Sequence, residues 1–189
     1  MAWYSLASVS TITPKMNWID ICSYSDPDGS TCCAPGMENK EYLVVSERHD
    51  WYGHSVACHH YGGHRGGLVV LEEREEWSCV LHYVLNAWQP SFQRYAISLR
   101  APFGMLGSYR WVYPNNSEVF PEYQEWTTGH PSGRNCVTML LGDGVDHQGS
   151  WWDVECVEDT GMFAVCERDK MSVASLRDIE YVYILTRST

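Results

Sequence analysis

The feature that most constrains the fold of this 189-residue chain is its set of eight cysteines. An even number of cysteines indicates disulfide bonds formed in an oxidising compartment. Zinc binding is the alternative, and it requires cysteines paired at short spacing. The only close pair is Cys32 and Cys33, and neighbouring cysteines form neither a good chelate nor a good mutual disulfide. We therefore expect a secreted or extracellular protein stapled by the cysteines at positions 22, 32, 33, 58, 79, 136, 156 and 166.

Length and charge narrow the class of protein. A chain of this length predicts one domain with extra sequence at its ends. The formal net charge of −11 excludes a basic surface for nucleic acid, and simple solubility is its plainest explanation. No apolar run approaches the ~20 residues that a membrane span needs. The N-terminus lacks the basic region of a signal peptide, so the extracellular location depends on the cysteines, and the chain is interpreted as a fragment or an incomplete gene model.

Periodicity predicts an α+β domain, with two early helices followed by strands and long loops. We expect a strand over 41–47, then a helix from Trp51 to about His60 that Asp50 caps. A short buried strand over 68–71 and a longer helix over 73–88 follow. Short apolar runs separated by Gly, Pro and Asn then predict antiparallel sheet. The domain boundaries that we predict are an N-terminal extension over 1–40, the domain over 41–168 and a tail over 169–189, in which IEYVYIL is either an added strand or part of the tail.

The helix over 73–88 is the clearest element, because its apolar residues recur at i, i+3 and i+4 spacing along one face. Cys79 points almost opposite this face, so we expect it outside the main core, where a cysteine of the N-terminal segment can reach it. The acidic residues at the start of the helix are explained by its dipole. Nine Trp and twelve Tyr suit a binding surface, although core packing is the more ordinary explanation of each.

Short motifs follow one another in a specific order from about Glu41 to Glu167. They are Trp51 with Cys58, Gly67-Leu68-Val69, Tyr95–Leu99, Tyr109-Arg110-Trp111, Trp126 with Gly129-His130-Pro131, Cys136, Trp151–Cys156, and Val165-Cys166-Glu167. Each motif is weak alone, but their order and the register of four cysteines are specific, and together they resemble the C-type-lectin-like domain. Two of the motifs depart from the family pattern, at the strand Tyr95–Leu99 and before Asp153.

The resemblance implies two disulfide bonds, Cys58–Cys166 and Cys136–Cys156, and a fold of two helices flanking two small antiparallel sheets with a long loop region. In the chain-entropy model the longer bridge stabilises the fold by ~4–5 kcal/mol and the shorter by ~3 kcal/mol. Family members with an N-terminal extension carry an extra cysteine pair. The remaining cysteines, Cys22, Cys32, Cys33 and Cys79, can form two bridges. Because Cys79 points away from the apolar face of its helix, we expect one of these bridges to join it to Cys32 or Cys33, and a free cysteine among the four stays an alternative.

The calcium site of the family's sugar-binding members is altered here. Those members draw oxygen ligands from a Glu-Pro-Asn or Gln-Pro-Asp triplet, from a following Glu, and from Asn-Asp before the cysteine. This chain has His130-Pro131-Ser132 at the triplet, no following Glu, and Trp152 in place of the Asn. Only Asp153 remains a hard oxygen ligand, and one carboxylate cannot hold calcium tightly. We therefore expect no required cofactor.

Two other groups offer metal ligands. Asp143 and Asp146 lengthen the turn before Trp151 and would add oxygens to a rearranged calcium site, although a solvated Asp/Gly turn explains them more simply. The group His59, His60 and His64 suggests zinc only with convergent geometry and a fourth ligand, and surface histidines are the ordinary explanation.

The sequence therefore predicts an extracellular recognition module rather than an enzyme, since no nucleophile–base pair or phosphate loop is present. Its expected ligand is a glycan or a protein, bound without the standard calcium–sugar site. The alternative is a calcium-dependent lectin with a site rearranged around Asp143, Asp146 and Asp153. Asn115 begins a glycosylation sequon. The residues predicted to lie around the ligand are His130, Ser132, Arg134, Trp151 and Asp153.

Overall fold

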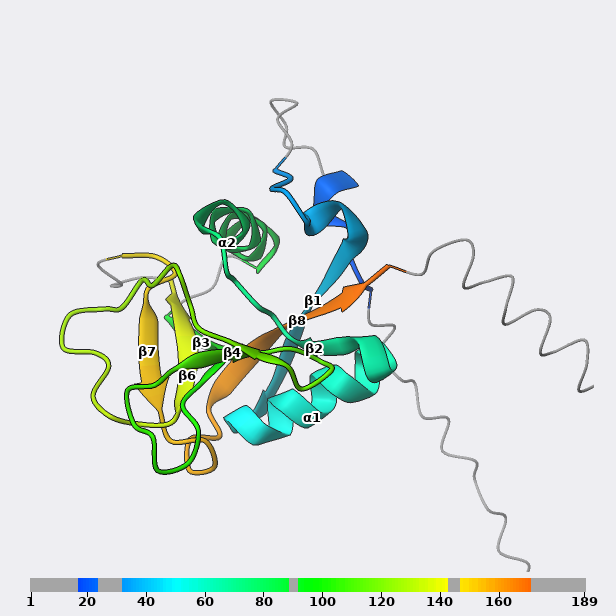
Figure 1. Ribbon diagram of the computed structural model, residues 1–189. Helices are drawn as coiled ribbons and strands as arrows, with labels where there is room; N and C mark the ends of the chain where they lie inside the picture. Colours follow the sequence, from blue (N-terminus) through cyan, green and yellow to red (C-terminus); the bar gives the residue numbers. More distant parts are fainter. Residues whose placement is uncertain (1–16, 24–31, 89–91, 143–146, 171–189) are drawn as a thin grey trace, which may run out of the picture.

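The computed structural model describes residues 17–23, 32–88, 92–142 and 147–170. Within these ranges two α-helices flank eight strands, which confirms the predicted α+β class (Figure 1). The predicted tail apart from Asp169 and Lys170, most of the N-terminal extension, and the residues Asp143 and Asp146 lie outside the described residues. The elements are β1 Lys40–His49, α1 Trp51–Gly62, β2 Gly66–Leu68, α2 Arg74–Trp88, β3 Gln93–Arg100, β4 Arg110–Val112, β5 Glu118–Val119, β6 Cys136–Leu141, β7 Trp151–Val154 and β8 Met162–Asp169.

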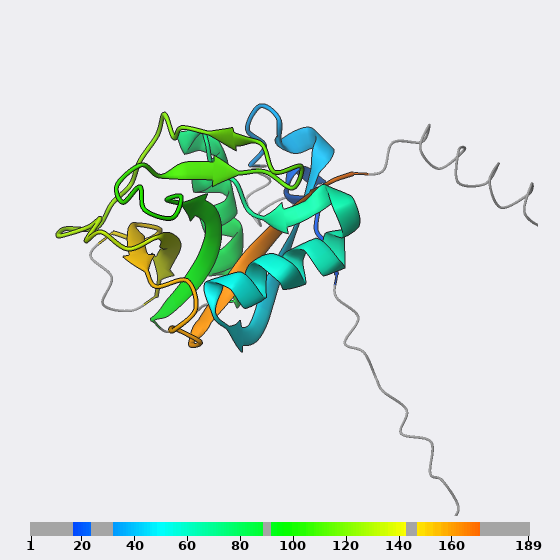
Figure 2. The ribbon, with the colours of Figure 1, turned by 60° about the horizontal axis from the view of Figure 1, so that its bottom comes forward.

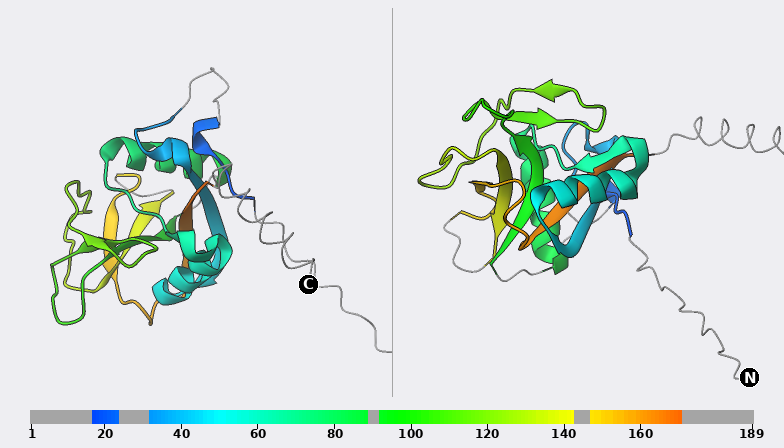
Figure 3. Two further views of the ribbon diagram at one scale, coloured as in Figure 1. Left: turned by 45° about the vertical axis from the view of Figure 1, so that its right-hand side comes forward. Right: turned by 90° about the horizontal axis from the view of Figure 1, so that it is seen from below.

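The strands that the structure describes form one connected sheet rather than two separate ones. Its main order is β1-β8-β3-β4-β5, with β2 beside β8 and the hairpin of β6 and β7 beside β3. The main strand order and the β6–β7 hairpin meet at β3. This strand pairs with β4 and β6 in antiparallel orientation and with β8 in parallel orientation. Figures 2 and 3 show the loop between β5 and β6, together with β6 and β7, on the far side of β3 from β1. The sheet therefore holds the loop region at one end of the molecule.

Two cores lie on opposite faces of the central strands, because side chains alternate along each strand. In β1, Tyr42 and Val44 belong to one core, and Leu43 and Val45 belong to the other. The first core includes Val80 and other residues of α2, and the second includes residues of α1. Figures 1 and 3 show the two helices on either side of these strands. Each helix thus covers one apolar face of the sheet.

Helix α1 begins at the predicted cap and ends two residues beyond the predicted end. The side chain of Asp50 accepts a hydrogen bond of 2.6 Å from the main-chain nitrogen of Gly53. Beyond the helix the chain turns back tightly into β2. A Cβ atom on Gly66 would lie 2.4 Å from the Cα of Gly62, so only glycine allows this close approach. The buried strand predicted over 68–71 is displaced, since β2 ends at Leu68 while the next three residues remain buried.

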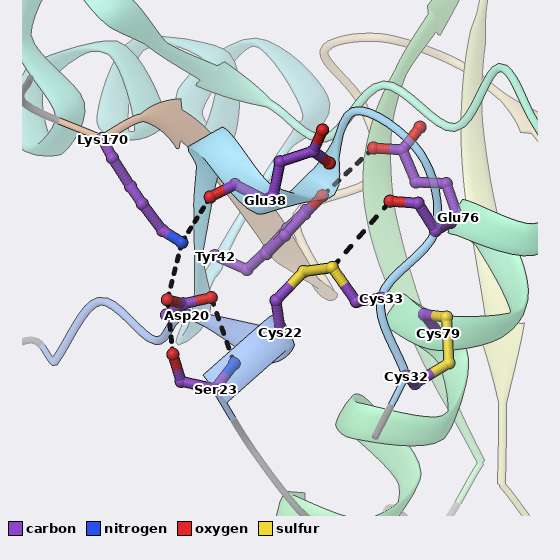
Figure 4. Close-up of a disulfide and its surroundings, with 11 residues drawn as sticks. Asp20, Cys22, Ser23, Cys32, Cys33, Glu38, Tyr42, Glu76, Cys79 and Lys170 are labelled. Carbon is purple, nitrogen blue, oxygen red and sulfur yellow. Dashed lines mark hydrogen bonds and ion pairs between the residues drawn. A yellow bond between two sulfur atoms is a disulfide. The ribbon is translucent and has the colours of Figure 1, made fainter. Parts of the chain in front are cut away.

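One expectation for α2 is corrected by the N-terminal segment that packs against it. Cys79 is 5% exposed and belongs to the core, because the segment from Cys32 onward covers its face of the helix. Glu76, which lies in the first turn of α2, is also buried. Its Oε1 lies 2.8 Å from Nζ of Lys40. The same oxygen accepts a hydrogen bond of 3.1 Å from the Tyr42 hydroxyl (Figure 4). Helix α2 is therefore anchored to β1 by polar contacts as well as by apolar packing.

Four disulfide bonds pair all eight cysteines. The two that the resemblance implied are present, Cys58–Cys166 between α1 and β8 and Cys136–Cys156 around the β6–β7 hairpin. Cys79 pairs with Cys32, one of its two predicted partners, and Cys22 pairs with Cys33 (Figure 4). The adjacent cysteines therefore serve two different bridges.

The two ends of the described chain lie side by side on β1. Ile19 forms a β-bridge with Tyr42, and the main-chain nitrogen of Lys170 donates to the Asn39 carbonyl at 2.7 Å. The Lys170 side chain also lies 2.6 Å from Asp20 (Figure 4). Among the described residues, no helix is long and apolar enough to cross a membrane.

Candidate functional site

Two of the residues predicted to form the site, Trp151 and Asp153, lie on β7, and the other three lie on the loop that leads into β6. In the hairpin of β6 and β7, Val137 pairs with Asp153. The loop that leads into β6 is fastened to β7, because the main-chain nitrogen of Thr127 donates to the Trp151 carbonyl at 3.0 Å. A parallel β-bridge between Trp126 and Trp151 adds a second attachment. The loop over residues 127–135 is thus held against β7 at one side and continues into β6 at the other.

The carboxylate of Asp153 is the anchor of this loop. The main-chain nitrogen of Ser132 lies 2.8 Å from both carboxylate oxygens, and that of Arg134 lies 2.7 Å from Oδ2. The Ser132 hydroxyl adds contacts of 3.2 Å to both oxygens. His130 Nδ1 donates to Oδ1, which requires that this ring nitrogen carry a proton. A single fully buried side chain therefore fixes both sides of the cis peptide bond between His130 and Pro131.

The hydrogen bonds decide the charge of Asp153. Burial alone raises its pKa, since a buried carboxylate loses its hydration. The hydrogen bonds from His130, Ser132 and Arg134 stabilise the charged form by more than burial destabilises it. The pKa of Asp153 consequently lies well below its usual range. The side chain is a permanent anion at neutral pH.

Tyr109 belongs to the same cluster, although the sequence did not single it out as a site residue. Its hydroxyl lies 2.7 Å from the Arg134 carbonyl and 3.3 Å from Oδ2 of Asp153. Burial, and then the negative charge of Asp153, raise the pKa of the Tyr109 hydroxyl, so it remains a donor. Its partners stand 25 and 44 positions away in the chain, and no local pattern signals contacts of that range.

The residues described around Asp153 do not fit a calcium ion. Calcium takes ~6–8 oxygen ligands, whereas the groups that surround this carboxylate are hydrogen-bond donors that occupy its lone pairs. The nearby Glu155 side chain is half exposed, with an oxygen 4.0 Å from Nε of Arg134. In the described part of the chain, no three His, Cys, Asp or Glu side chains gather as metal ligands. The two extra aspartates considered for a rearranged site, Asp143 and Asp146, lie outside that part.

Of the five residues predicted around the ligand, four meet at one point. His130, Ser132 and Arg134 surround Asp153, and the His130 ring packs on the Trp152 ring with centroids 4.7 Å apart. Trp151 differs from the expectation, because its side chain is fully buried. It points into the core and supports the loop from below, with edge-on contacts to Trp111, Tyr123 and Trp126.

The remaining candidate residues lie on other elements. Asn115 is exposed, in the turn between β4 and β5, and its Oδ1 accepts a hydrogen bond of 2.9 Å from the main-chain nitrogen of Ser117. His59 and His60 are exposed at the end of α1, and His64 is exposed in the turn that follows. In the described part of the chain, no hydrogen bond joins these residues to the Asp153 cluster.

Comparison with known proteins identifies the fold. No protein-family model matches the sequence, and no curated protein matches it. Among solved structures, human lithostathine superposes with a TM-score of 0.59 at 21% identity, over 77% of this chain and 92% of that one. A mouse scavenger receptor C-type lectin carbohydrate-recognition domain gives 0.54 at 20% identity, over 74% and 99%. The C-type lectin CEL-I from Cucumaria echinata gives 0.56 at 18% identity, over 71% and 91%. The arrangement of helices, sheet and disulfides described above is that of a C-type lectin-like domain.

Proposed function

We propose that this chain is an extracellular recognition module that binds a glycan or protein ligand without calcium. The observation that carries the proposal is the saturation of Asp153 by donors from His130, Ser132 and Arg134. The carboxylate that would hold a cation instead holds the loop. The loop thus keeps its shape through internal hydrogen bonds rather than through a metal.

The surface beside Asp153 supports recognition of a ligand that carries acidic groups or that stacks on aromatic rings. The Arg134 side chain is 48% exposed and meets the equally exposed Glu155 only at 4.0 Å, so its guanidinium is open to a second partner. The His130 ring is partly exposed and stacks on Trp152, which is itself partly exposed. Arginine beside aromatic rings is typical of binding surfaces for proteins and for sugars.

Two further features support an extracellular location. Four disulfide bonds close the described fold, and such bonds persist where the compartment is oxidising. The sequon at Asn115 is solvent-facing, so a glycan there meets no steric obstacle from its own turn. The mouse structure named above is a carbohydrate-recognition domain, which supports a glycan as one of the two ligand classes.

A calcium titration by calorimetry, followed by a glycan-array screen with and without chelator, tests the proposal. We expect no heat of calcium binding at the Asp153 cluster and array signals that the chelator leaves unchanged. An Asp153→Asn variant is the matched control, because it removes the one carboxylate of the cluster. Calcium binding that this substitution abolishes, or glycan signals that the chelator removes, would contradict the proposal.

Substitution of Arg134 tests where the ligand binds, whichever of the two ligand classes it belongs to. Substitution of Arg134 by Ala leaves the fold intact, because only its main-chain nitrogen and carbonyl take part in the Asp153 cluster. We expect this variant to lose ligand binding while its thermal unfolding stays unchanged. A variant that unfolds normally and retains full affinity for every ligand found would contradict the placement of the binding surface.

A further inference from the structure

An exposed apolar loop joins β3 to β4 beside the proposed recognition surface. Phe103 is 100% exposed, Leu106 is 59% exposed and Met105 is 49% exposed. Of the nine large hydrophobic residues exposed in the described ranges, these three lie on one loop and two more, Val119 and Phe120, lie on the neighbouring β5 segment. Scattered apolar residues on a surface are ordinary, but a cluster of this kind marks an interaction site.

The loop has a defined shape that turns its apolar side chains outward. Main-chain hydrogen bonds of 2.9 Å, from Met105 to Pro102, and of 3.0 Å, from Ser108 to Met105, close two successive turns. Gly104 and Gly107 take positive φ angles of 78° and 84° at these turns. The loop, green at the lower left of the view in Figure 1, thus projects as a convex turn of the chain, and its apolar side chains are exposed.

Both ends of this apolar loop are hydrogen-bonded to the loop over residues 127–135, the recognition loop. The main-chain nitrogen of Ala101 donates to the Asn135 carbonyl at 2.7 Å, and the Asn135 amide returns a bond of 3.3 Å to the Ala101 carbonyl. At the other end the Tyr109 hydroxyl donates to the Arg134 carbonyl. The tip is therefore held in place before it meets any partner, and little conformational entropy is lost when it does.

Charge is distributed in a way that suits a lipid surface. The nine residues from Ala101 to Tyr109 carry no charge, although the chain as a whole is strongly acidic. Arg100 and Arg110 flank the loop and share one carboxylate, that of Glu118, at 3.4 and 3.6 Å. This base of the loop keeps an excess positive charge. The Arg110 guanidinium also covers the exposed Phe120 ring, 4.4 Å from its centroid.

We propose that the tip formed by Phe103, Met105 and Leu106 inserts into the interfacial region of a phospholipid membrane, with Arg100 and Arg110 facing the phosphates. A convex apolar tip finds its complement in a deformable lipid surface, whereas a protein partner would have to supply a matching pocket. Arginine side chains at the base of an apolar segment gain from phosphate headgroups and from anionic lipid. The recognition surface around Arg134, which shares its loop with Asn135, would then lie close to the membrane plane.

Co-sedimentation of the full, disulfide-bonded chain with phosphatidylcholine vesicles, with and without phosphatidylserine, tests this proposal. We expect binding to both, stronger to the anionic vesicles at low salt. The double variant Phe103→Asp/Leu106→Asp should bind at least about tenfold more weakly, because burial of each side chain in lipid is lost. Val56→Asp is the matched control, since Val56 is 69% exposed on α1 and outside the tip.

Each outcome decides the proposal. Binding that falls only in the tip variant supports it, and a Phe103→Trp variant adds a direct readout, because brominated lipid should quench its extra fluorescence. Absence of vesicle binding, equal loss in Val56→Asp, or concentration-dependent self-association that the tip variant abolishes would overturn it. The calcium and glycan tests of the proposed function use a different surface, so failure of one proposal leaves the other distinguishable.

Discussion

Nζ of Lys40 lies 2.8 Å from Oε1 of Glu76, which joins the first residue of β1 to the first turn of α2. The same nitrogen lies 3.2 Å from Oε2 of Glu167 on β8. Burial alone lowers the pKa of the Lys40 ammonium, but the two carboxylates outweigh burial and raise it well above its usual range. One lysine thus balances two buried carboxylates where three elements meet.

Removal of this lysine should destabilise the fold strongly. In Lys40→Met the side chains of Glu76 and Glu167, 7% and 5% exposed, lose the cationic partner that they share. A buried carboxylate without a partner costs about 3–5 kcal/mol of the free energy of unfolding, which urea denaturation measures. Lys170→Met is the control, because the Lys170–Asp20 pair is more exposed and should cost under about 1 kcal/mol. Equal losses in both variants would contradict this explanation.

Glu167 should make stability fall as the pH rises through neutrality. Burial raises its pKa to about 7 from an ordinary value of 4.5, with Lys40 opposing and Glu76 reinforcing the shift. The folded state therefore holds a proton that the unfolded state has released. The stability from this group is complete below pH 4.5 and is lost as the pH rises through about 7.

The measurement is the difference in the free energy of unfolding between Glu167→Gln and the wild type as a function of pH. A difference is needed because the pH dependence that His54 contributes has the opposite sign. Burial lowers the pKa of the His54 ring, so its contribution is lost as the pH falls below 6.5. The variant should gain on the wild type by up to about 1.4 kcal/mol per pH unit between the two pKa values of Glu167. A difference that does not change with pH would show that Glu167 stays ionised.

Asp153→Asn should loosen the recognition loop. The asparagine amide would face the main-chain nitrogens of Ser132 and Arg134 with a donor instead of an acceptor. We expect a loss of about 3 kcal/mol in the free energy of unfolding. Since the pKa of Asp153 is lowered, the wild type should lose this advantage as the pH falls below 3.8. Glu155→Gln, at a half-exposed position, should change stability by less than about 0.5 kcal/mol.

Gly149→Ala should show how tightly α2 packs on the turn before β7. Gly149 has a φ angle of 81°, and a Cβ atom there would lie 2.7 Å from Cζ2 of Trp77. The Trp77 indole also donates to the Gly149 carbonyl at 3.1 Å, so the ring is not free to move. Strain and overpacking together should cost about 3 kcal/mol.

The control for this substitution is Gly36→Ala. Gly36 has a similar φ angle of 87°, and no atom lies within 4 Å of the Cβ position there. Backbone strain alone should cost about 1 kcal/mol at that position. The difference between the stability losses of the two variants, taken from their melting curves, isolates the contact with Trp77. Equal losses would show that Trp77 moves aside at no cost in stability.

The sequence by itself determined helices, strands and two of the disulfide bonds. The spacing of apolar residues predicted α2 to within one residue of its start, and one of the short apolar runs that predicted antiparallel sheet coincides with β6. The register of cysteines with a known family implied Cys58–Cys166 and Cys136–Cys156, both of which are present. These features are local or repeat a family pattern, so the chain carries their signal without its fold.

Only the tertiary structure decided which polar groups are buried and what they hold. Glu76 was explained by the helix dipole alone, Trp151 was expected at the ligand surface, and Tyr109 matched a family motif without any sign that it belongs to the site. Cys79 had two candidate partners, and the path of the N-terminal segment selected Cys32. Each outcome depends on contacts between elements distant in the chain. Burial and hydrogen bonding arise only when those elements pack, so local periodicity cannot predict them.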